Sequence, residues 1–170
     1  MVIKDEDVFV VQLVALAPDM QGFAGGSVPV DRREQYGSKY PHNWMSGGKR
    51  DPNEKPVDSA KREAFEEGWQ VPEGANVYEV LRGVKDGFGK LSGTPCVFSI
   101  VVCDEPLIKL KEYKEKYRGV EQRTLTMADI KALWNPGSKS DPVWDIHERV
   151  LSGEKNIPPI NLNKRGEWVW

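Results

Sequence analysis

The sequence has few of the residues that build disulfide frameworks and zinc sites, with two cysteines and two histidines among 170 residues. Cys96 and Cys103 fall seven residues apart in one strand-like run, so an extended chain would hold them about 23 Å apart on opposite faces. That separation excludes a disulfide between them. A zinc site is not expected either, because there is no C-x-x-C pair and His42 and His147 are far apart. Both thiols are predicted to be buried and inert, and His147 to be a partly buried structural residue.

Long apolar runs and an excess of charge of one sign are also missing. The longest apolar run covers residues 8–17 and is interrupted by Gln12, well short of the ~18 residues of a membrane span. Acidic residues 5–7 precede this run, where a secretory signal would carry positive charge. Lys and Arg number 24 and Asp and Glu 26, so the net charge of -2 gives no global basic field. We therefore expect a cytoplasmic protein with no membrane partner and no long nucleic acid partner.

The composition that remains is typical of a folded domain, with 39% hydrophobic and 29% charged residues. A chain of 170 residues fits one domain with a sizeable core, and no repeat or linker divides it. We predict a single domain over residues 1–170. Residues 153–170 are rich in Pro and Asn and are predicted to form an irregular C-terminal tail.

Alternation, turn residues and capping signals predict strands mixed with a few helices, and therefore an α/β or α+β sandwich. Residues 18–27 are Gly-rich and 34–43 polar, and both are predicted to be loops; a charged stretch at 109–117 has helical character. The predicted strands cover 8–16, 28–33 at an edge, 44–45, 76–85, 94–103 and 120–125, and the predicted helices 56–68, 126–134 and 141–151.

The predicted helix at 56–68 starts with Pro56, which suits the first helical position, and has Asp58 in its first turn. A stripe of small apolar residues follows at i, i+3, i+7 and i+11, which favours close packing on a sheet. The stripe consists of Val57, Ala60, Ala64 and Gly68.

Three carboxylates lie beside this stripe on the same helix. Glu63, Glu66 and Glu67 are at i, i+3 and i+4, within about 100° of one another, and so they repel each other. A hard divalent cation would offset that repulsion, because Mg²⁺ takes carboxylate oxygens and keeps waters and phosphates as other ligands. The alternative is a solvated acidic face that neighbouring Lys61 and Arg62 balance.

The stretch from Gly48 to Gln70 resembles the signature of the Nudix hydrolases, G-x5-E-x7-R-E-U-x-E-E-x-G-U, where U is apolar. By composition, six charged or Gly identities at fixed spacing would occur by chance in roughly one window in ten million. A weaker likeness extends upstream to Arg33 and Trp44, and downstream to Glu121 before a strand and a helix. The matching residues of the signature are Gly48, Glu54, Arg62, Glu63, Ala64, Glu66 and Glu67.

The sequence departs from the family pattern at the end of the predicted helix. Trp69 stands where the family has Gly, and Gly68 comes one position early. Because Gly at a helix end normally takes the left-handed cap, we expect the helix to stop about one residue sooner than in the family. The departure removes no charged group, so the resemblance still implies an active enzyme.

The resemblance implies a Nudix-type α/β/α sandwich with a mixed central sheet. It also implies a Mg²⁺- or Mn²⁺-dependent hydrolase that cleaves the diphosphate of a nucleoside diphosphate linked to a moiety X. In that reading Glu63, Glu66, Glu67 and the Gly47 carbonyl hold the metal, and one of the glutamates also acts as base. Arg62 orients the carboxylates, Glu54 orients Arg62, and Glu121 assists metal or water; for Glu121, simple surface charge is an equal alternative.

The sequence leaves the substrate open: nucleotides, nucleotide derivatives and capped RNA are all candidates. A homodimer is compatible with the chain. A non-catalytic Nudix-fold module that binds a nucleotide and regulates a partner is the main alternative, and an isoprenoid-type diphosphate isomerase is a weaker one. The candidate phosphate- and base-binding residues, any of which could instead be solvent-exposed charge or core, are Arg33, Trp44, Lys49, Arg50 and Trp69.

Overall fold

The computed structural model describes residues 3–28, 43–86, 94–133 and 141–160. Its largest sheet has the strand order β4-β1-β7-β6, with β1 at Val10–Val14, β4 at Gly47–Lys49, β6 at Val77–Asp86 and β7 at Pro95–Cys103. Strands β1 and β7 run parallel, whereas β4 pairs with β1 and β6 with β7 in antiparallel fashion. The central sheet is therefore mixed, as predicted.

Two smaller antiparallel sheets complete the strand layer. Strand β2 (Phe23–Ser27) lies between β3 (Asn43–Met45) and β9 (Glu121–Leu125). Strand β5 (Trp69–Gln70) pairs with β8 (Ile108–Lys109) just after the end of the first α-helix. A short 3₁₀-helix, η1 (Asp5–Asp7), precedes β1, and a second, η4 (Lys114–Arg118), precedes β9.

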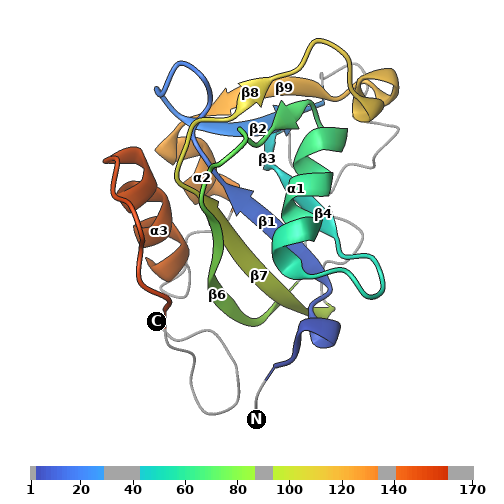
Figure 1. Ribbon diagram of the computed structural model, residues 1–170, viewed down its shortest axis with the longest axis vertical. Coiled ribbons are helices and arrows are strands. Elements are labelled where there is room, and N and C mark those ends of the chain that lie inside the picture. The colour runs from blue at the N-terminus through green and yellow to red at the C-terminus, as the bar shows by residue number, and fades with distance from the viewer. Residues whose placement is uncertain (1–2, 29–42, 87–93, 134–140, 161–170) are drawn as a thin grey trace.

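Helices cover the central sheet on both sides (Figure 1). Helix α1 (Pro56–Glu66) packs on one face, where Ala60 and Ala64 are fully buried against β1 and β7. Helices α2 (Met127–Leu133) and α3 (Asp141–Leu151) pack on the other face. Alternate residues of β7 enter the two cores because side chains of a strand point to opposite faces. This arrangement is the predicted α/β/α sandwich.

Helix α1 begins and ends for local reasons. Pro56 occupies the first helical position, and Glu67 is the residue that caps the end. Gly68 then takes a left-handed conformation with φ of 97°, and a Cβ there would lie 2.5 Å from Nε2 of Gln122. Glycine is therefore required at position 68, both by its backbone and by its close neighbours. The helix ends at Glu66, two residues before the predicted limit.

One prediction about a loop was wrong, and one about a helical segment was only partly right. Part of the predicted Gly-rich loop at 18–27 is strand β2, because Gly25 and Gly26 allow neighbouring chains to approach closely. A Cβ on Gly25 would lie 2.7 Å from the Trp44 carbonyl oxygen and 2.5 Å from a methyl carbon of Leu125. The stretch at 109–117 is not an α-helix; it contains the last residue of β8 and the start of η4.

The other structural expectations concern buried residues and the chain ends. Cys96 and Cys103 are buried, packed in different cores and not joined by a disulfide, as predicted. His147 is completely buried, more than predicted, and its ring meets that of Phe23 edge-on at 4.8 Å. Residues 153–160 contain no helix or strand; the rest of the predicted tail lies outside the described residues. No described helix is both long and apolar enough to cross a bilayer.

Candidate functional site

The carboxylates of Glu63, Glu66 and Glu67 lie together at the C-terminal end of α1, facing β4 and η4. Their side chains are largely shielded, with exposed fractions of 16% for Glu63 and 22% for Glu66, and 5% for the whole Glu67 residue. Carboxylates on an ordinary solvated helix face would be far more exposed. The burial therefore argues against the alternative of a solvated acidic face.

Glu67 is the most deeply buried member of this cluster. Its Oε1 accepts a hydrogen bond of 3.0 Å from the backbone N–H of Gly47, its Oε2 is buried without a close hydrogen-bond partner among the described residues, and the Trp44 side chain is a further donor toward this carboxylate. Burial raises the pKa of Glu67 well above its usual range; the Gly47 N–H opposes this, and the negative charges of Glu63 and Glu115 add to it. A buried carboxylate oxygen without a donor is costly unless a cation or proton satisfies it.

Arg62 is held in place by Glu54 from the loop before α1. Nε of Arg62 lies 2.9 Å from Oε2 of Glu54, and Nη2 lies 3.1 Å from Oε1, which makes a bidentate pair. Ser59 also donates to Glu54 at 2.5 Å, and Nη2 of Arg62 donates to the Lys49 carbonyl at 3.1 Å. The hydrogen bond from Arg62 lowers the pKa of Glu54 to about 2, and Glu54 in turn raises the pKa of Arg62.

The remaining nitrogen of Arg62 reaches the acidic cluster itself. Nη1 lies 3.1 Å from Oε1 of Glu63 and 3.3 Å from Oε1 of Glu66. Burial raises the pKa of Glu63, Arg62 opposes that shift, and Glu66 adds to it. The predicted chain of contacts, in which Glu54 positions Arg62 and Arg62 contacts the carboxylates, is thus present.

The two glycines of β4 lie directly against these carboxylates. A Cβ on Gly48 would lie 2.5 Å from Oε2 of Glu63, so any larger residue there would displace that carboxylate. A Cβ on Gly47 would lie 2.3 Å from the Val11 carbonyl oxygen on β1. The Gly-Gly pair therefore lets the backbone of β4 pass between β1 and the acidic end of α1.

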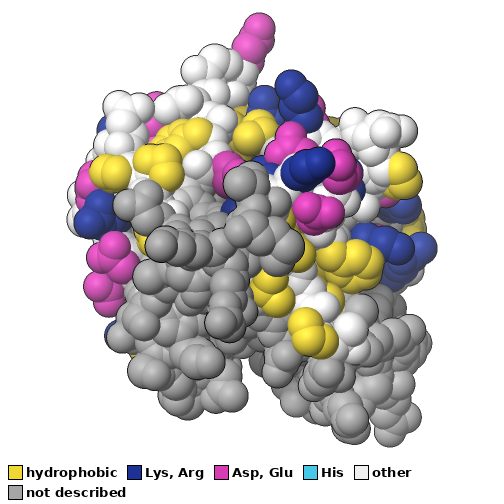
Figure 2. Space-filling view, turned by 90° about the horizontal axis from the view of Figure 1, so that it is seen from below, with side chains coloured by type: hydrophobic (Ala, Val, Ile, Leu, Met, Phe, Trp, Pro, Cys, Tyr) yellow, Lys and Arg dark blue, Asp and Glu magenta, His cyan; other side chains and the backbone are white. Residues whose placement is uncertain are grey.

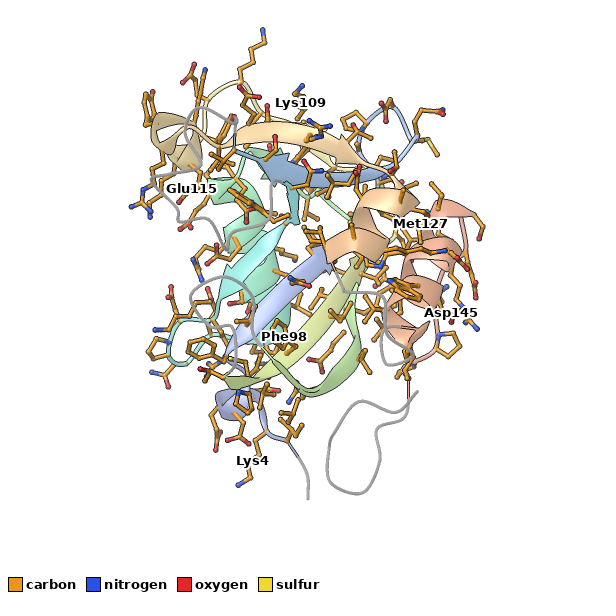
Figure 3. All side chains as sticks on the ribbon, turned by 180° about the vertical axis from the view of Figure 1, so that it is seen from behind. Lys4, Phe98, Lys109, Glu115, Met127 and Asp145 are labelled. Carbon is orange, nitrogen blue, oxygen red and sulfur yellow. The ribbon has the colours of Figure 1, made fainter. Side chains whose placement is uncertain are left out.

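A fourth carboxylate, which the sequence did not single out, faces the cluster from η4. The negative charge of Glu115 raises the pKa of both Glu63 and Glu67, and the neighbouring Lys114 places its Nζ 3.6 Å from Oε1 of Glu66. Figure 3 shows Glu115 beside the end of α1. Nothing local distinguishes Glu115 from Glu112 in the charged run 109–118, so sequence reasoning had no signal to find it.

Glu121, the predicted late glutamate, has a different place. It is exposed at the start of β9, opposite Ser27 of β2. Within the described part of the chain it has no recorded contact with Glu63, Glu66 or Glu67. Among the described residues, Glu115 is the late glutamate whose negative charge raises the pKa of Glu63 and of Glu67.

Two of the predicted phosphate-binding cations contribute to the scaffold. The guanidinium of Arg50 donates to four backbone carbonyls, those of Glu6 at 2.8 Å, Val8 at 2.7 Å, and Asp51 and Glu54 at 3.0 Å each. It therefore fastens the loop before α1 to the N-terminal segment. The ammonium of Lys49 lies 5.3 Å from the centre of the Phe9 ring. Arg33 lies outside the described residues.

The two predicted stacking residues, Trp69 and Trp44, differ in how exposed they are and in how close they lie to the acidic cluster. Trp69 is 2% exposed and donates its indole N–H to the Gly25 carbonyl at 3.0 Å, so its ring offers a ligand almost no surface. Trp44 is half-buried on β3, and its side chain lowers the pKa of Glu67. Its indole nitrogen would lie 3.1 Å from a Cβ on Gly26. Of the two, only Trp44 is both accessible and close to the acidic cluster.

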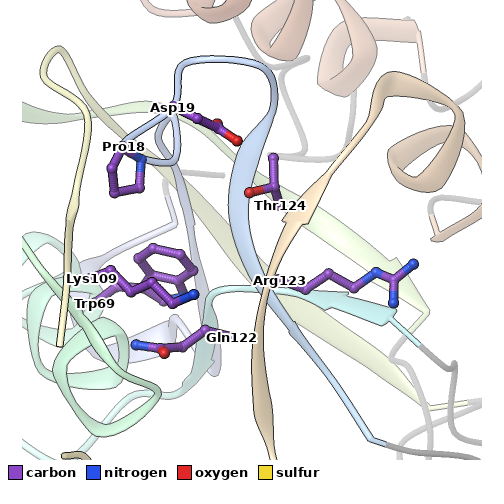
Figure 4. Close-up of a pocket in the computed structure, with 7 residues that line it drawn as sticks. All are labelled: Pro18, Asp19, Trp69, Lys109, Gln122, Arg123 and Thr124. Atoms are coloured by element: carbon purple, nitrogen blue, oxygen red, sulfur yellow. The ribbon is translucent and has the colours of Figure 1, made fainter. Parts of the chain in front are cut away.

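A pocket of about 240 Å³ opens near the start of β5 (Figure 4). The Trp69 indole and the Gln122 side chain lie on one side of it, and Asp19 and Thr124 face each other on the other. The guanidinium of Arg123 points away from it. None of the clustered glutamates lines this pocket, so it is separate from the acidic site. The lining residues are Pro18, Asp19, Trp69, Lys109, Gln122, Arg123 and Thr124.

The donor set at the end of α1 fits a divalent cation in its chemistry, because hard cations take carboxylate oxygens and Oε2 of Glu67 lacks a partner. In the described residues, however, no three His, Cys, Asp or Glu side chains converge as they would around a bound ion. Nη1 of Arg62 contacts Oε1 of both Glu63 and Glu66, so Arg62 would hold one oxygen of each carboxylate while the other oxygen meets a cation. Figure 2 shows acidic and basic side chains side by side on one face of the molecule.

The fold is similar to those of several solved structures. A MutT structure from work on the fish pathogen Aliivibrio salmonicida and on Vibrio cholerae has a TM-score of 0.51 at 16% identity, covering 85% of this chain and 97% of its own. A structure described as an ADP compounds hydrolase has a TM-score of 0.53 at 16% identity, covering 87% and 75%. A MutT protein from Methanosarcina mazei Go1 has a TM-score of 0.52 at 12% identity, covering 88% and 96%.

At these identities the likeness establishes the fold, and it confirms the Nudix-type α/β architecture that the resemblance implied. No protein-family model and no curated protein sequence matches the chain.

Proposed function

We propose that the protein is a divalent-metal-dependent hydrolase that cleaves the diphosphate of a nucleoside diphosphate linked to a further moiety. The observation that carries the proposal is the shielded carboxylate cluster at the end of α1, with an unpartnered Glu67 oxygen, on a fold shared with MutT proteins and with an ADP compounds hydrolase. Mg²⁺ or Mn²⁺, when bound, neutralises a diphosphate and activates water for attack at phosphorus.

Some residues of the chain would bind the cation, and others would position those residues. Glu63, Glu66 and Glu67 supply the anionic oxygens. Arg62 positions Glu63 and Glu66 through Nη1, and Glu54 positions Arg62 through two hydrogen bonds. This support is rigid because Glu54 is itself fixed by further hydrogen bonds from its own loop and helix.

Proton transfer from the attacking water needs a carboxylate near the cluster, and two described glutamates are candidates. Glu67 is one candidate, because its carboxylate is buried within the cluster. Glu115 faces Glu63 and Glu67 from η4, and it takes the place that the sequence resemblance gave to Glu121. Replacing Glu115 by Gln should therefore lower turnover more than replacing Glu121 by Gln, and equal effects would contradict this assignment.

Among the described residues, Trp44 is the one best placed to contact the nucleoside. It is half-buried, lies near Glu67 and precedes the Gly-Gly pair of β4 by three positions. A base stacked on an indole gains ~1–3 kcal/mol, and the metal and phosphate residues alone cannot distinguish one nucleotide from another.

The proposal is tested by a substrate screen with Mg²⁺ that covers nucleoside triphosphates, ADP-ribose, NADH and dinucleoside polyphosphates. We expect release of a nucleoside monophosphate or of inorganic diphosphate from at least one compound, abolished by EDTA. No turnover across the panel, together with micromolar binding of a nucleotide, would instead support the non-catalytic binding module.

A further inference from the structure

Lys114 on η4 reaches the acidic cluster through a weak ion pair. Its Nζ lies 3.6 Å from Oε1 of Glu66, beyond the 2.7–3.2 Å of an ordinary N–H···O hydrogen bond. The Lys114 side chain is 62% exposed, so water screens the pair and the lysine loses little by leaving it. Lys114 is therefore a mobile counter-charge at the edge of the cluster.

The other cations of η4 pair with carboxylates other than Glu63, Glu66 and Glu67. Lys116 contacts Glu112 at 3.0 Å and the Lys111 carbonyl at 3.1 Å, and Arg118 pairs with Glu115 at 3.6 Å. For Lys114, Glu66 is the one recorded ion-pair partner within the described residues. Lys114 therefore pairs with α1, whereas Lys116 pairs with residues that lie just before η4 in the chain.

The second cation on Glu66 behaves differently. Nη1 of Arg62 lies 3.3 Å from the same Oε1, but its Nε and Nη2 are bound to Glu54 at 2.9 and 3.1 Å. Arg62 therefore stays with the loop before α1 when Glu66 changes partner. Lys114 has no such anchor and can move with its four-carbon chain.

We propose that Lys114 is a substrate-positioning residue that neutralises Glu66 in the metal-free protein and binds a phosphate oxygen of the substrate once Glu66 holds a divalent cation. A lysine suits this exchange because its ammonium is a compact charge with three donors that binds carboxylate or phosphate without fixed geometry. The inference rests on the proposed function, because it requires a divalent cation at Glu66 and a diphosphate beside it.

The exchange predicts opposite effects on two ligands. Calorimetric titration of the nucleotide-free protein with Mn²⁺ should give two- to fivefold tighter binding in Lys114→Ala than in wild type, because a competing cation is gone. Binding of α,β-methylene-ADP at saturating Mn²⁺ should be about tenfold weaker in Lys114→Ala, because a phosphate contact is gone. Lys114→Arg should restore most of the nucleotide affinity.

The matched control is Lys116→Ala, which removes a neighbouring exposed lysine of η4 that pairs with Glu112. It should change both affinities less than twofold, and the melting temperatures of both variants should stay near that of wild type. If wild type binds no Mn²⁺, the proposed function and this inference fall together. If wild type binds Mn²⁺ but Lys114→Ala does not produce both opposite changes, or Lys116→Ala produces the same ones, the role of Lys114 is refuted while the proposed function stands.

Discussion

Replacing Glu54 by Gln removes the charge that holds Arg62 and leaves the shape of the site almost unchanged. Gln can still accept the hydrogen bonds that Ser59 and the Asp51 N–H donate to Glu54, but it cannot form a charged bidentate pair with Arg62. The substitution therefore isolates the Glu54–Arg62 pair.

The magnitude follows from the pKa of Glu54, which Arg62 lowers from 4.5 to about 2. At about 1.4 kcal/mol per pH unit this difference corresponds to an upper limit of about 3 kcal/mol. Both side chains are partly exposed, with fractions of 16% for Glu54 and 28% for Arg62, so solvent screening reduces it. We expect Glu54→Gln to lower the free energy of unfolding by about 1–2 kcal/mol at pH 7.

The same pair gives the destabilisation a characteristic pH dependence. The pKa of Glu54 is lower in the folded than in the unfolded protein, so its stabilisation is fully present above about pH 4.5 and is lost as the pH falls toward 2. Urea unfolding of wild type and Glu54→Gln from pH 7 to pH 3 should show their difference shrink by roughly half. Glu73→Gln, at an exposed loop position, is the control. A difference that is absent at pH 7, or constant with pH, would refute the assigned pair.

Three further substitutions test Trp44 near the site, Arg50 in the scaffold and His147 in the core. Trp44→Ala should raise KM by roughly 5- to 100-fold with a smaller change in kcat, since stacking is worth ~1–3 kcal/mol; a well-folded variant with unchanged KM would show that Trp44 does not hold the base. Arg50→Lys keeps the charge but loses most of the four carbonyl contacts, so the unfolding free energy should fall by about 1–3 kcal/mol with KM unchanged. A raised KM without loss of stability would instead support phosphate binding by Arg50. Burial lowers the pKa of His147 from 6.5 to about 4, so its neutral form stabilises the fold above pH 6.5 and this stability is lost toward pH 4; between pH 7 and 5 wild type should lose about 2 kcal/mol more than His147→Leu in urea unfolding, and equal losses would contradict the buried neutral histidine.

The sequence predicts helix α1 and its carboxylates well because both depend on local spacing. Ala60 and Ala64 lie on one helical face and are buried in the structure, and Pro56 begins the helix as predicted. Glu63 and Glu67 follow the same helical period, so their proximity was readable without any tertiary information.

The glycine-rich segment was misread because local sequence does not show what packs against a glycine. Gly25 and Gly26 are typical of loops, but in β2 they admit Trp44 and Leu125 at distances that a Cβ would not allow. Only the pairing of β2 with β3 and β9 shows that these glycines serve close packing rather than flexibility.

The contacts of Glu115 and Arg50 could not be predicted from the sequence for a related reason. Glu115 reaches the cluster because η4 folds back over the end of α1, and its local sequence matches that of other charged positions in 109–118. Arg50 stands next to the glycine pair and resembles a phosphate ligand, but its carbonyl partners at Glu6 and Val8 lie more than forty residues earlier in the chain. Contacts with residues far away in the sequence position both Glu115 and Arg50.

The most direct test of the proposed metal-dependent hydrolase compares the Mg²⁺-dependent turnover of wild type and Glu67→Gln on the best substrate of the screen. Gln keeps the size of Glu67 but removes the anionic oxygens that a divalent cation would need. We predict a fall in turnover of on the order of 10³, or about 4 kcal/mol of transition-state stabilisation, with a melting temperature near that of wild type. Near-normal Mg²⁺-dependent turnover by Glu67→Gln would contradict the account.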